Sequence, residues 1–280
     1  MNHKVLSLLL LLALASCSNV EKQASVYLDA ASSAFALGQY DEAKALIDSI
    51  KVLFPKAFDA RRAGISLMRE VELAETRRTL AYLDSLQTAT QAKVNAIRGR
   101  YAFEKDEEYE AVGHYLHPQH VVEQALHRSF LRFQTDENGR LSMTSIYCGA
   151  ANIHHTAVRV TAPDGTFAQT PPAPESYETT VLDEKIERAD FPQGQDGDVM
   201  GFIYLNHDKN LSLRFIGDRN YNTSLTQTDR EALVAVRDLS CLLTTLAQVR
   251  SQIEEANQKV AFLQRKMKEA AEKEAENSKD

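Results

Sequence analysis

The sequence predicts an α+β protein built from an N-terminal helical hairpin, an antiparallel two-helix coiled-coil stalk, and an antiparallel β-rich head inserted between the stalk helices. Two observations lead to this prediction. Segments 57–103 and 228–274 both have helical periodicity, and each is 47 residues long. Segment 104–227, which lies between them, changes to the period of two that is typical of strands and contains several short turns. Because the termini of a compact domain often lie close together, the two helices can run side by side in opposite directions.

The chain begins with an apolar stretch that is typical of a secretory leader. Lys4 is followed by apolar residues from Val5 to Ala15, interrupted only by Ser7. This stretch has about the length of a signal-peptide core and is too short to cross ~30 Å of hydrocarbon as a helix. An ordinary cleaved leader would not require a cysteine at its end, but Cys17 stands there.

The four residues Leu14-Ala15-Ser16-Cys17 resemble the bacterial lipobox, which consists of an aliphatic residue, two small residues and an obligatory cysteine. The resemblance implies that residues 1–16 are a lipoprotein signal peptide and that Cys17 is lipidated after cleavage. Two or more acyl chains hold a protein durably on a membrane. By analogy with lipoproteins of enteric bacteria, Ser18 favours the outer membrane, and we expect the chain to face the periplasm.

The composition limits the classes of partner. Cleavage would remove one lysine and change the formal net charge from −7 to −8. An acidic chain without a concentrated basic face is a poor candidate for binding nucleic acid, and it would be repelled by an anionic bilayer. Attachment would therefore depend on the lipid. In an oxidising envelope Cys148 and Cys241 could form a disulfide, whereas their position in apolar runs favours buried thiols.

The first domain, residues 17–56, is predicted to carry the lipidated cysteine and a helical hairpin between Val20 and Leu53. Gly38 suits the left-handed position that ends the first helix, and Pro55 ends the second. The stretch ALGQYDEAKALIDSIKVLFPKA resembles a tetratricopeptide repeat. The residues that match the positions of this motif are Gly38, Tyr40, Ala43, Ile47, Ile50 and Pro55. Stable arrays normally need three or more copies, so one copy indicates a packing unit more than a peptide-binding array.

The two stalk helices are predicted over 57–103 and 228–275, followed by a disordered tail at 276–280. Thr228-Asp229-Arg230-Glu231 has the pattern of a capping box at the start of the second helix. Beyond it, apolar residues recur at alternating spacings of three and four, as in a coiled coil. These positions are Ala232, Ala235, Leu239, Leu242, Leu246, Val249, Ile253, Ala256, Val260, Leu263, Met267 and Ala270.

The head, residues 104–227, is predicted to contain a short helix and six to eight antiparallel strands. Pro118 suits the first turn of a helix with the sequence HVVEQALHR. The predicted strands have the sequences SFLRFQT, RLSMTSIYCG, HHTAVRVTA, FAQT, YETTVL, VMGFIYLN and LSLRFIGD. Because VMGFIYL is apolar throughout, we expect it to be a central strand. Turns of two to four residues between strands favour hairpins.

The head contains candidate metal ligands but no known catalytic motif. His114, His117 and His120 are spaced three apart, so a helix could offer two or three imidazoles to zinc. Pro118 interrupts that helix, however, and solvent-facing or capping histidines are the competing interpretation. The loop 190–198, DFPQGQDGD, could loosely chelate calcium, but it lacks the spacing of an EF-hand, and a solvated loop is the alternative. Nucleophile elbows, HExxH and phosphate-binding loops are absent.

We therefore expect a lipid-anchored protein of the bacterial cell envelope that acts as a binding or scaffolding module through its stalk and head. No catalytic, cofactor-binding or resident metal residue is assigned, and no cofactor is expected. The expected partners are the membrane, through the lipid on Cys17, and an envelope protein, through the coiled coil or the head. The alternative is an envelope hydrolase, or a protein that binds a small ligand or a glycan, with its site in the head.

Overall fold

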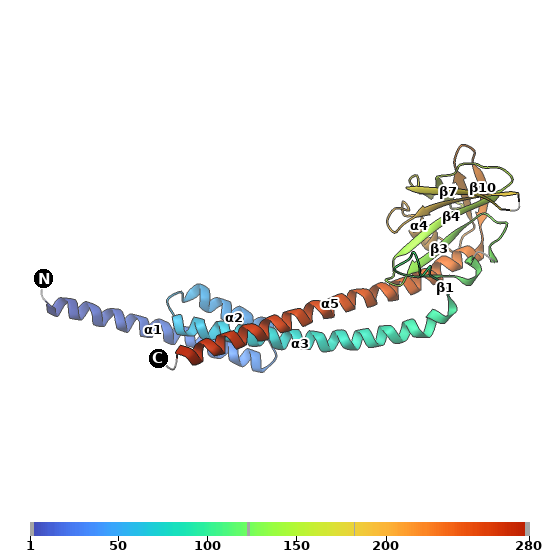
Figure 1. Cartoon of the computed structure of the whole chain (residues 1–280). Helices are drawn as coiled ribbons and strands as arrows, with labels where there is room; N and C mark the ends of the chain where they lie inside the picture. Colours follow the sequence, from blue (N-terminus) through green and yellow to red (C-terminus); the bar gives the residue numbers. More distant parts are fainter. Residues whose placement is uncertain (1–2, 122–123, 182, 278–280) are drawn as a thin grey trace. The chain divides into compact units, whose positions relative to one another are not determined.

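The computed structural model describes residues 3–121, 124–181 and 183–277, and for residues 3–18 it describes the backbone alone. These residues form helices and antiparallel sheets, which confirms the α+β class (Figure 1). The chain divides into two compact units. We call residues 1–85 with 251–280 the helical unit, and residues 86–250 the β unit.

Three helices begin the chain: α1 (His3–Ala36), α2 (Tyr40–Leu53) and α3 (Phe58–Ile97). The turn between α1 and α2 contains Gly38, whose φ of +73° lies in the left-handed region that glycine adopts without strain. The two helices are amphipathic and pack together through small and aliphatic side chains. The buried residues of this part of the helical unit are Ala24, Ala31, Ala34, Ala43, Ile47, Ile50, Ala57, Ala60 and Val71.

The last helix, α5 (Gln227–Asn277), begins at a capping box that differs from the predicted one. Thr226 is the cap: its hydroxyl accepts a hydrogen bond of 3.1 Å from the backbone N–H of Asp229. The carboxylate of Asp229 in turn accepts from the backbone N–H of Thr226 at 3.2 Å. The prediction was therefore wrong by two residues, because the sequence contains two overlapping patterns, and the buried Asp229 closes the one that begins at Thr226.

Helix α5 also contains an 18-residue window with a mean hydropathy of 1.4, which is long and apolar enough to cross a membrane. Of this window 44% is buried within the protein. In the β unit, Leu233 belongs to the core between the sheets, and Leu239 and Leu246 pack with Val94 of α3. A buried core helix meets the same criterion, so the hydropathy of α5 is weak evidence for a membrane span.

The end of α3 and the beginning of α5 run antiparallel within the β unit. Tyr101, which follows α3, donates a hydrogen bond of 2.8 Å to the backbone carbonyl of Ala235. Towards the middle of both helices, Arg250 donates to Gln91 at 3.3 Å. The residue numbers therefore rise along one helix while they fall along the other.

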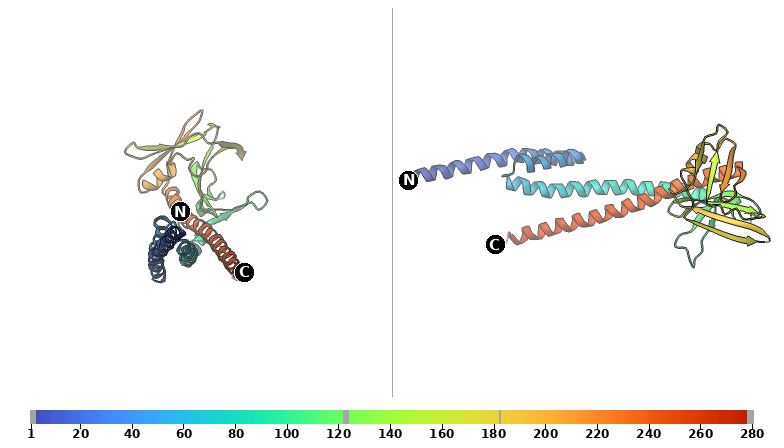
Figure 2. Two further views of the ribbon diagram at one scale, coloured as in Figure 1. Left: turned by 90° about the vertical axis from the view of Figure 1, so that its left-hand side faces the viewer. Right: turned by 90° about the horizontal axis from the view of Figure 1, so that it is seen from above.

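The β unit contains two antiparallel sheets of six and four strands, and Figure 2 shows the strands gathered around the first turns of α5. The six-stranded sheet has the order β1-β2-β3-β4-β8-β7, and the four-stranded sheet has the order β10-β9-β5-β6. The bounds are β1 (Ala102–Glu104), β2 (His114–Leu116), β3 (Phe130–Asp136), β4 (Leu141–Gly149), β5 (Ala157–Thr161), β6 (Phe167–Gln169), β7 (Glu175–Val181), β8 (Glu184–Phe191), β9 (Leu211–Ile216) and β10 (Tyr221–Leu225).

The described strands exceed the six to eight that were predicted, and two predicted elements have a different structure. The short strands β1, β2 and β10 contain too few residues for a clear alternation. Segment VMGFIYL is helix α4 (Val199–Leu205) instead of a central strand. A short run that is apolar throughout has no period that separates a buried strand from a buried helix. Here the carboxylate of Asp196 accepts the backbone N–H of Met200 at 2.9 Å and so supports the helix start.

Two further loop predictions are corrected. The helix predicted after Pro118 is not formed. The chain makes only a 3₁₀ turn, η2 (Pro118–His120), and residues 121 and 124–129 are not α-helical. Residues 122–123 of the predicted helix lie outside the described part. Loop 190–198 is not fully solvated, because Asp196 is 5% exposed. This carboxylate is occupied by the start of α4.

Side-chain alternation divides the six-stranded sheet into two faces. The inner face packs on the four-stranded sheet, α4 and α5. Its core includes Leu131, Phe133, Met143, Tyr147, Ala189, Phe191, Val158, Val160, Leu211, Leu213, Phe215, Ile203 and Leu233. The alternate residues of β3, β4 and β8 point to the outer face, and the candidate site lies there.

Candidate functional site

A cavity of about 280 Å³ lies on the outer face of the six-stranded sheet. Strand pairing places its floor: Phe130 of β3 lies beside Ile146 of β4, which lies beside Arg188 of β8. Two residues further along these strands, Cys148 of β4 pairs with Ile186 of β8. The residues that line the cavity are His120, Ala125, Leu126, His127, Arg128, Phe130, Arg132, Ile146, Cys148, Val181, Glu184, Ile186 and Arg188.

The segment that follows η2 forms one side of the cavity. His127 has a φ of +60°, which turns the chain sharply. Its Nδ1 lies 2.5 Å from a carboxylate oxygen of Glu184 and links this segment to β8. The guanidinium of Arg128 lies over the ring of Phe130, with 4.6 Å between the guanidinium carbon and the ring centroid. These contacts hold the segment against the sheet.

A buried polar network supports the same segment from α5. The imidazole Nε2 of His120 lies 3.0 Å from the carboxylate of Asp229, and Arg128 contacts the same oxygen. Burial by itself would raise the pKa of Asp229, but the hydrogen bonds from His120 and Thr226 and the charge of Arg128 together lower it. Asp229 is therefore ionised at neutral pH, and Nε2 of His120 carries a proton that it donates.

Two residues that line the cavity each have a buried polar atom without a hydrogen-bond partner within the described part of the chain. The atoms are Nδ1 of His120, whose side chain is fully buried, and Nε of Arg132. The terminal nitrogen of Arg132 contacts Glu104, which leaves its Nε–H without an acceptor. A buried polar group without a partner costs about 1–3 kcal/mol. Such groups are rare in folded proteins, so two at one cavity indicate a site that binds a polar group.

The thiol of Cys148 also faces the cavity. It donates a hydrogen bond of 3.3 Å to Glu184, the carboxylate that His127 contacts. Burial, with a further contribution from Glu184, raises the pKa of Cys148 to about 11. The thiol is therefore protonated at neutral pH, and a protonated thiol is a poor nucleophile.

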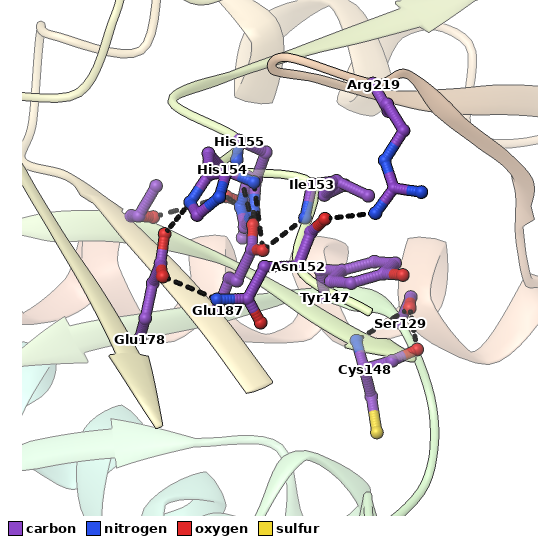
Figure 3. Close-up of polar contacts among 12 residues, drawn as sticks. Ser129, Tyr147, Cys148, Asn152, Ile153, His154, His155, Glu178, Glu187 and Arg219 are labelled. Carbon is purple, nitrogen blue, oxygen red and sulfur yellow. Dashed lines mark hydrogen bonds and ion pairs between the residues drawn. The ribbon is translucent and has the colours of Figure 1, made fainter. Parts of the chain in front are cut away.

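A second polar cluster is centred on Glu187 of β8 (Figure 3). His155 Nδ1 donates to Glu187 at 2.9 Å, and Ser145 donates to His155 Nε2 at 2.8 Å. This order of serine, histidine and carboxylate has the geometry of a catalytic triad. However, Ser145 is fully buried, and His155 and Glu187 are each 2% exposed. A substrate cannot reach this serine unless the two sheets separate locally.

The same Glu187 fixes a sharp turn of the backbone. Its two carboxylate oxygens accept the backbone N–H groups of Ile153, His154 and His155 at 2.6–2.9 Å. These bonds hold His154 at a φ of +52° and direct its Nδ1 to Glu178 at 2.6 Å (Figure 3). Ligand atoms of His154, Glu178 and Glu187 lie within 4.8 Å of one another, as metal ligands do. Since each oxygen of Glu187 already accepts two hydrogen bonds, this cluster is a structural clamp.

The histidines singled out in the sequence do not converge on one point. His114 lies 3.9 Å from Glu110, and His117 caps η2 by accepting from the backbone N–H of Gln119 at 3.3 Å. His120 is turned towards Asp229. In the described residues, these three histidines are not found together as a group that could hold a metal ion. One of them, His120, instead lines the cavity.

The two cysteines expected in the head and in the stalk are both free thiols, so the disulfide alternative is wrong. Cys148 is partly buried at the cavity, but Cys241 is exposed, contrary to the expectation of two buried thiols. The side chain of Cys17 lies outside the described part of the chain. Its lipidation therefore stays a prediction.

Sequence reasoning did not identify the charged residues of the cavity, which are Arg128, Arg132, Glu184, Arg188 and, behind His120, Asp229. One signal was available: Phe130 and Arg132 lie two residues apart on one face of β3, and Arg128 comes two residues before Phe130. Comparison with known proteins adds nothing to this geometry, because no family model, curated protein or solved structure matches the chain.

Proposed function

We propose that this chain is a lipid-anchored binding protein of the bacterial cell envelope, and that its β unit holds a small ligand in the cavity on the outer face of the six-stranded sheet. The observation that carries the proposal is the pair of unpartnered buried atoms, His120 Nδ1 and Arg132 Nε, in a wall that is otherwise mostly apolar. A concave apolar site with a few polar groups is typical of small-molecule recognition.

The state of the nucleophiles favours binding over catalysis. The thiol of Cys148 faces the cavity but is held protonated, with a pKa of about 11. The hydroxyl of Ser145 has a histidine and a carboxylate in line with it but is enclosed by the core. Within the described residues, the cavity therefore presents recognition groups, and the triad-like cluster serves the fold.

The anchor and the stalk belong to the same proposal. The residues Leu14-Ala15-Ser16-Cys17 support lipidation of Cys17 and an envelope location. Ser18 favours the outer membrane, with the chain facing the periplasm. The antiparallel contacts from Gln91 to Arg250 and from Tyr101 to Ala235 support a two-helix stalk. We propose that the β unit meets a ligand and that the paired helices offer a surface to an envelope partner.

The two free thiols allow a direct test of the cavity. We would use the full chain with Cys17→Ser and measure alkylation of Cys148 and Cys241 by mass spectrometry. The neutral apolar probe N-phenyl-1-naphthylamine should slow the alkylation of Cys148, which faces the cavity. Labelling of the exposed Cys241 should not change, so this residue is an internal control.

A cavity-filling variant provides the matched comparison. In Ile146→Trp the added ring would occupy the floor of the cavity and should abolish the fluorescence increase of the bound probe. Leu205→Trp, at a position that is 76% exposed and outside the cavity, should bind the probe as the parent chain does. Equal binding by both variants, or a Cys148 that the probe does not protect, would contradict the proposed site.

A further inference from the structure

We propose that the ligand of this cavity is an anionic amphiphile, in which one apolar chain ends in a carboxylate. The inference rests on the proposed binding function and specifies the chemistry of its ligand. It is carried by three features of the cavity: the loosely paired guanidinium of Arg188, the unpartnered Nε–H of Arg132, and the apolar floor and rim.

The charged residues of the wall are unequal in sign. The lining contains three guanidinium groups, those of Arg128, Arg132 and Arg188, and one carboxylate, that of Glu184. Glu184 is already engaged by His127 and Cys148. Arg128 and Arg132 are paired closely with Asp229 and Glu104, so Arg188 is the guanidinium of the lining that remains most available to attract an anion.

Arg188 is the cation with the weakest existing pairing. Its guanidinium lies 3.7 Å from Asp190, and half of its side chain is exposed. Arg128 and Arg132, in contrast, contact Asp229 and Glu104 closely. Arg188 of β8 pairs with Ile146 of β4, which lies in the floor of the cavity. Arg188 can therefore bind the head of a ligand whose chain covers Ile146. Arginine holds a carboxylate through two parallel hydrogen bonds.

One unpartnered nitrogen adds a directional contact. The Nε–H of Arg132 needs an acceptor, and a carboxylate oxygen supplies one. His120 donates its Nε2–H to Asp229, so its Nδ1 is an acceptor, which an ionised carboxylate cannot fill because it has no proton. A carboxylate head group therefore satisfies the Nε–H of Arg132, whereas a trimethylammonium head has no acceptor for it.

The remainder of the lining fits an apolar chain and not a sugar. Ala125, Phe130, Ile146 and Ile186 surround the interior. Leu126 and Val181, which are 56% and 46% exposed, extend this apolar surface to solvent at the rim. The volume of about 280 Å³ is at the lower end for ligand pockets, and it favours a single chain over a two-chain lipid.

The test compares three probes with the same chain and different heads: decanoate, decan-1-ol and decyltrimethylammonium. The readout is protection of Cys148 from iodoacetamide at about pH 9, where the thiolate fraction is measurable, with Cys241 as the internal control. This readout reports occupancy of the cavity alone, so binding of a probe to the apolar leader does not contribute. The protein is the full chain with Cys17→Ser.

We expect decanoate to protect Cys148 at a concentration about tenfold below that of decan-1-ol, as one charge-assisted contact implies. Arg188→Gln should remove this preference, so that decanoate and decan-1-ol protect Cys148 at similar concentrations. The control Arg159→Gln changes an arginine of β5 that lies outside the cavity, and it should behave as the parent chain does.

The outcomes separate this inference from the proposed function. If decan-1-ol or decyltrimethylammonium protects as well as decanoate, the anionic class is wrong and the cavity still binds ligands. If Arg188→Gln keeps the preference for decanoate, Arg188 does not bind the head group and its assignment is wrong. If none of the probes protects Cys148, both the ligand class and the proposed function fail.

Discussion

His120 and Asp229 form a buried hydrogen bond of 3.0 Å although 109 residues separate them. Asp229 is the third residue of α5, and its carboxylate also closes the capping box with Thr226. One side chain therefore fixes the start of a long helix and the segment that encloses the cavity. This relationship makes the stability of the β unit depend on the charge of Asp229.

Asp229→Asn should destabilise the β unit. The amide cannot neutralise Arg128, whose side chain is 30% exposed, and it replaces charge-assisted hydrogen bonds by weaker ones, which costs about 2 kcal/mol. Urea unfolding followed by circular dichroism would measure this change. Asp41→Asn is the control, since Asp41 pairs with Lys44 at 3.0 Å on the surface and is 96% exposed, and it should unfold as the parent chain does.

The same substitution should change the response to acid. The pKa of Asp229 is lower in the folded chain than its ordinary value of 3.8. Its contribution to stability is therefore fully present above about pH 4 and is lost as the pH falls through the folded pKa. Stability measured from neutral pH to about pH 2 should decline less steeply in Asp229→Asn. An unchanged slope would show that Asp229 is not protonated on acid unfolding.

Glu184→Gln should make Cys148 more reactive. Burial is the main reason for its pKa of about 11, and Glu184 contributes to the rise. Removing the carboxylate charge lowers the pKa, so the thiolate fraction and the alkylation rate at about pH 8 should increase severalfold. In the parent chain the exposed Cys241 should react faster than Cys148. Equal rates for both thiols would contradict the described environment of Cys148.

Ser145 should act as a structural residue. Ser145→Ala removes the donor to His155 Nε2 and should destabilise the β unit by about 2 kcal/mol. A fluorophosphonate probe should not label Ser145 in the folded chain, because the side chain is enclosed. Labelling of the parent chain that disappears in Ser145→Ala would instead reveal a serine hydrolase.

Gly139 connects the β3–β4 turn to α5. Its φ is +85°, and a Cβ at this position would lie 2.3 Å from the backbone nitrogen of Thr244. Gly139→Ala should therefore destabilise the β unit by about 3 kcal/mol, from backbone strain and overpacking together. Gly165 has nearly the same φ, +86°, with no atom within 4 Å of such a Cβ. Gly165→Ala should cost only the strain, about 1 kcal/mol, and thermal unfolding would compare the two.

The antiparallel pairing within the β unit can be tested by cross-linking. Cysteines at Gln91 and Arg250, in a chain whose three natural cysteines are replaced by serine, should be joined by a short bismaleimide. The side chains of these residues are in contact at 3.3 Å. The pair Lys93 and Arg250 is the control, because two residues along a helix turn the side chain to the other side. Equal yields for both pairs would argue against this register.

Several elements were predictable because their signals are local. Gly38 and Pro55 mark the ends of α1 and α2 through their own backbone preferences. Alternation in segment 211–216 identifies strand β9, since one of its faces is buried. Segment 199–205 was not predictable in this way, because a uniformly apolar run has no period. Its helix depends on burial in the core of the β unit and on the hydrogen bond from Met200 to Asp196.

The sequence by itself determined the α+β class and the hairpin turn, because each depends on residues that are neighbours in the chain. The tertiary structure decided the cavity. Its wall combines His120, Phe130, Ile146 and Arg188, which meet only when the segment after η2 folds over strands that are paired in the order β3-β4-β8. It also decided which capping box is used, because burial of Asp229 beneath His120 and Arg128 depends on contacts between residues far apart in the chain.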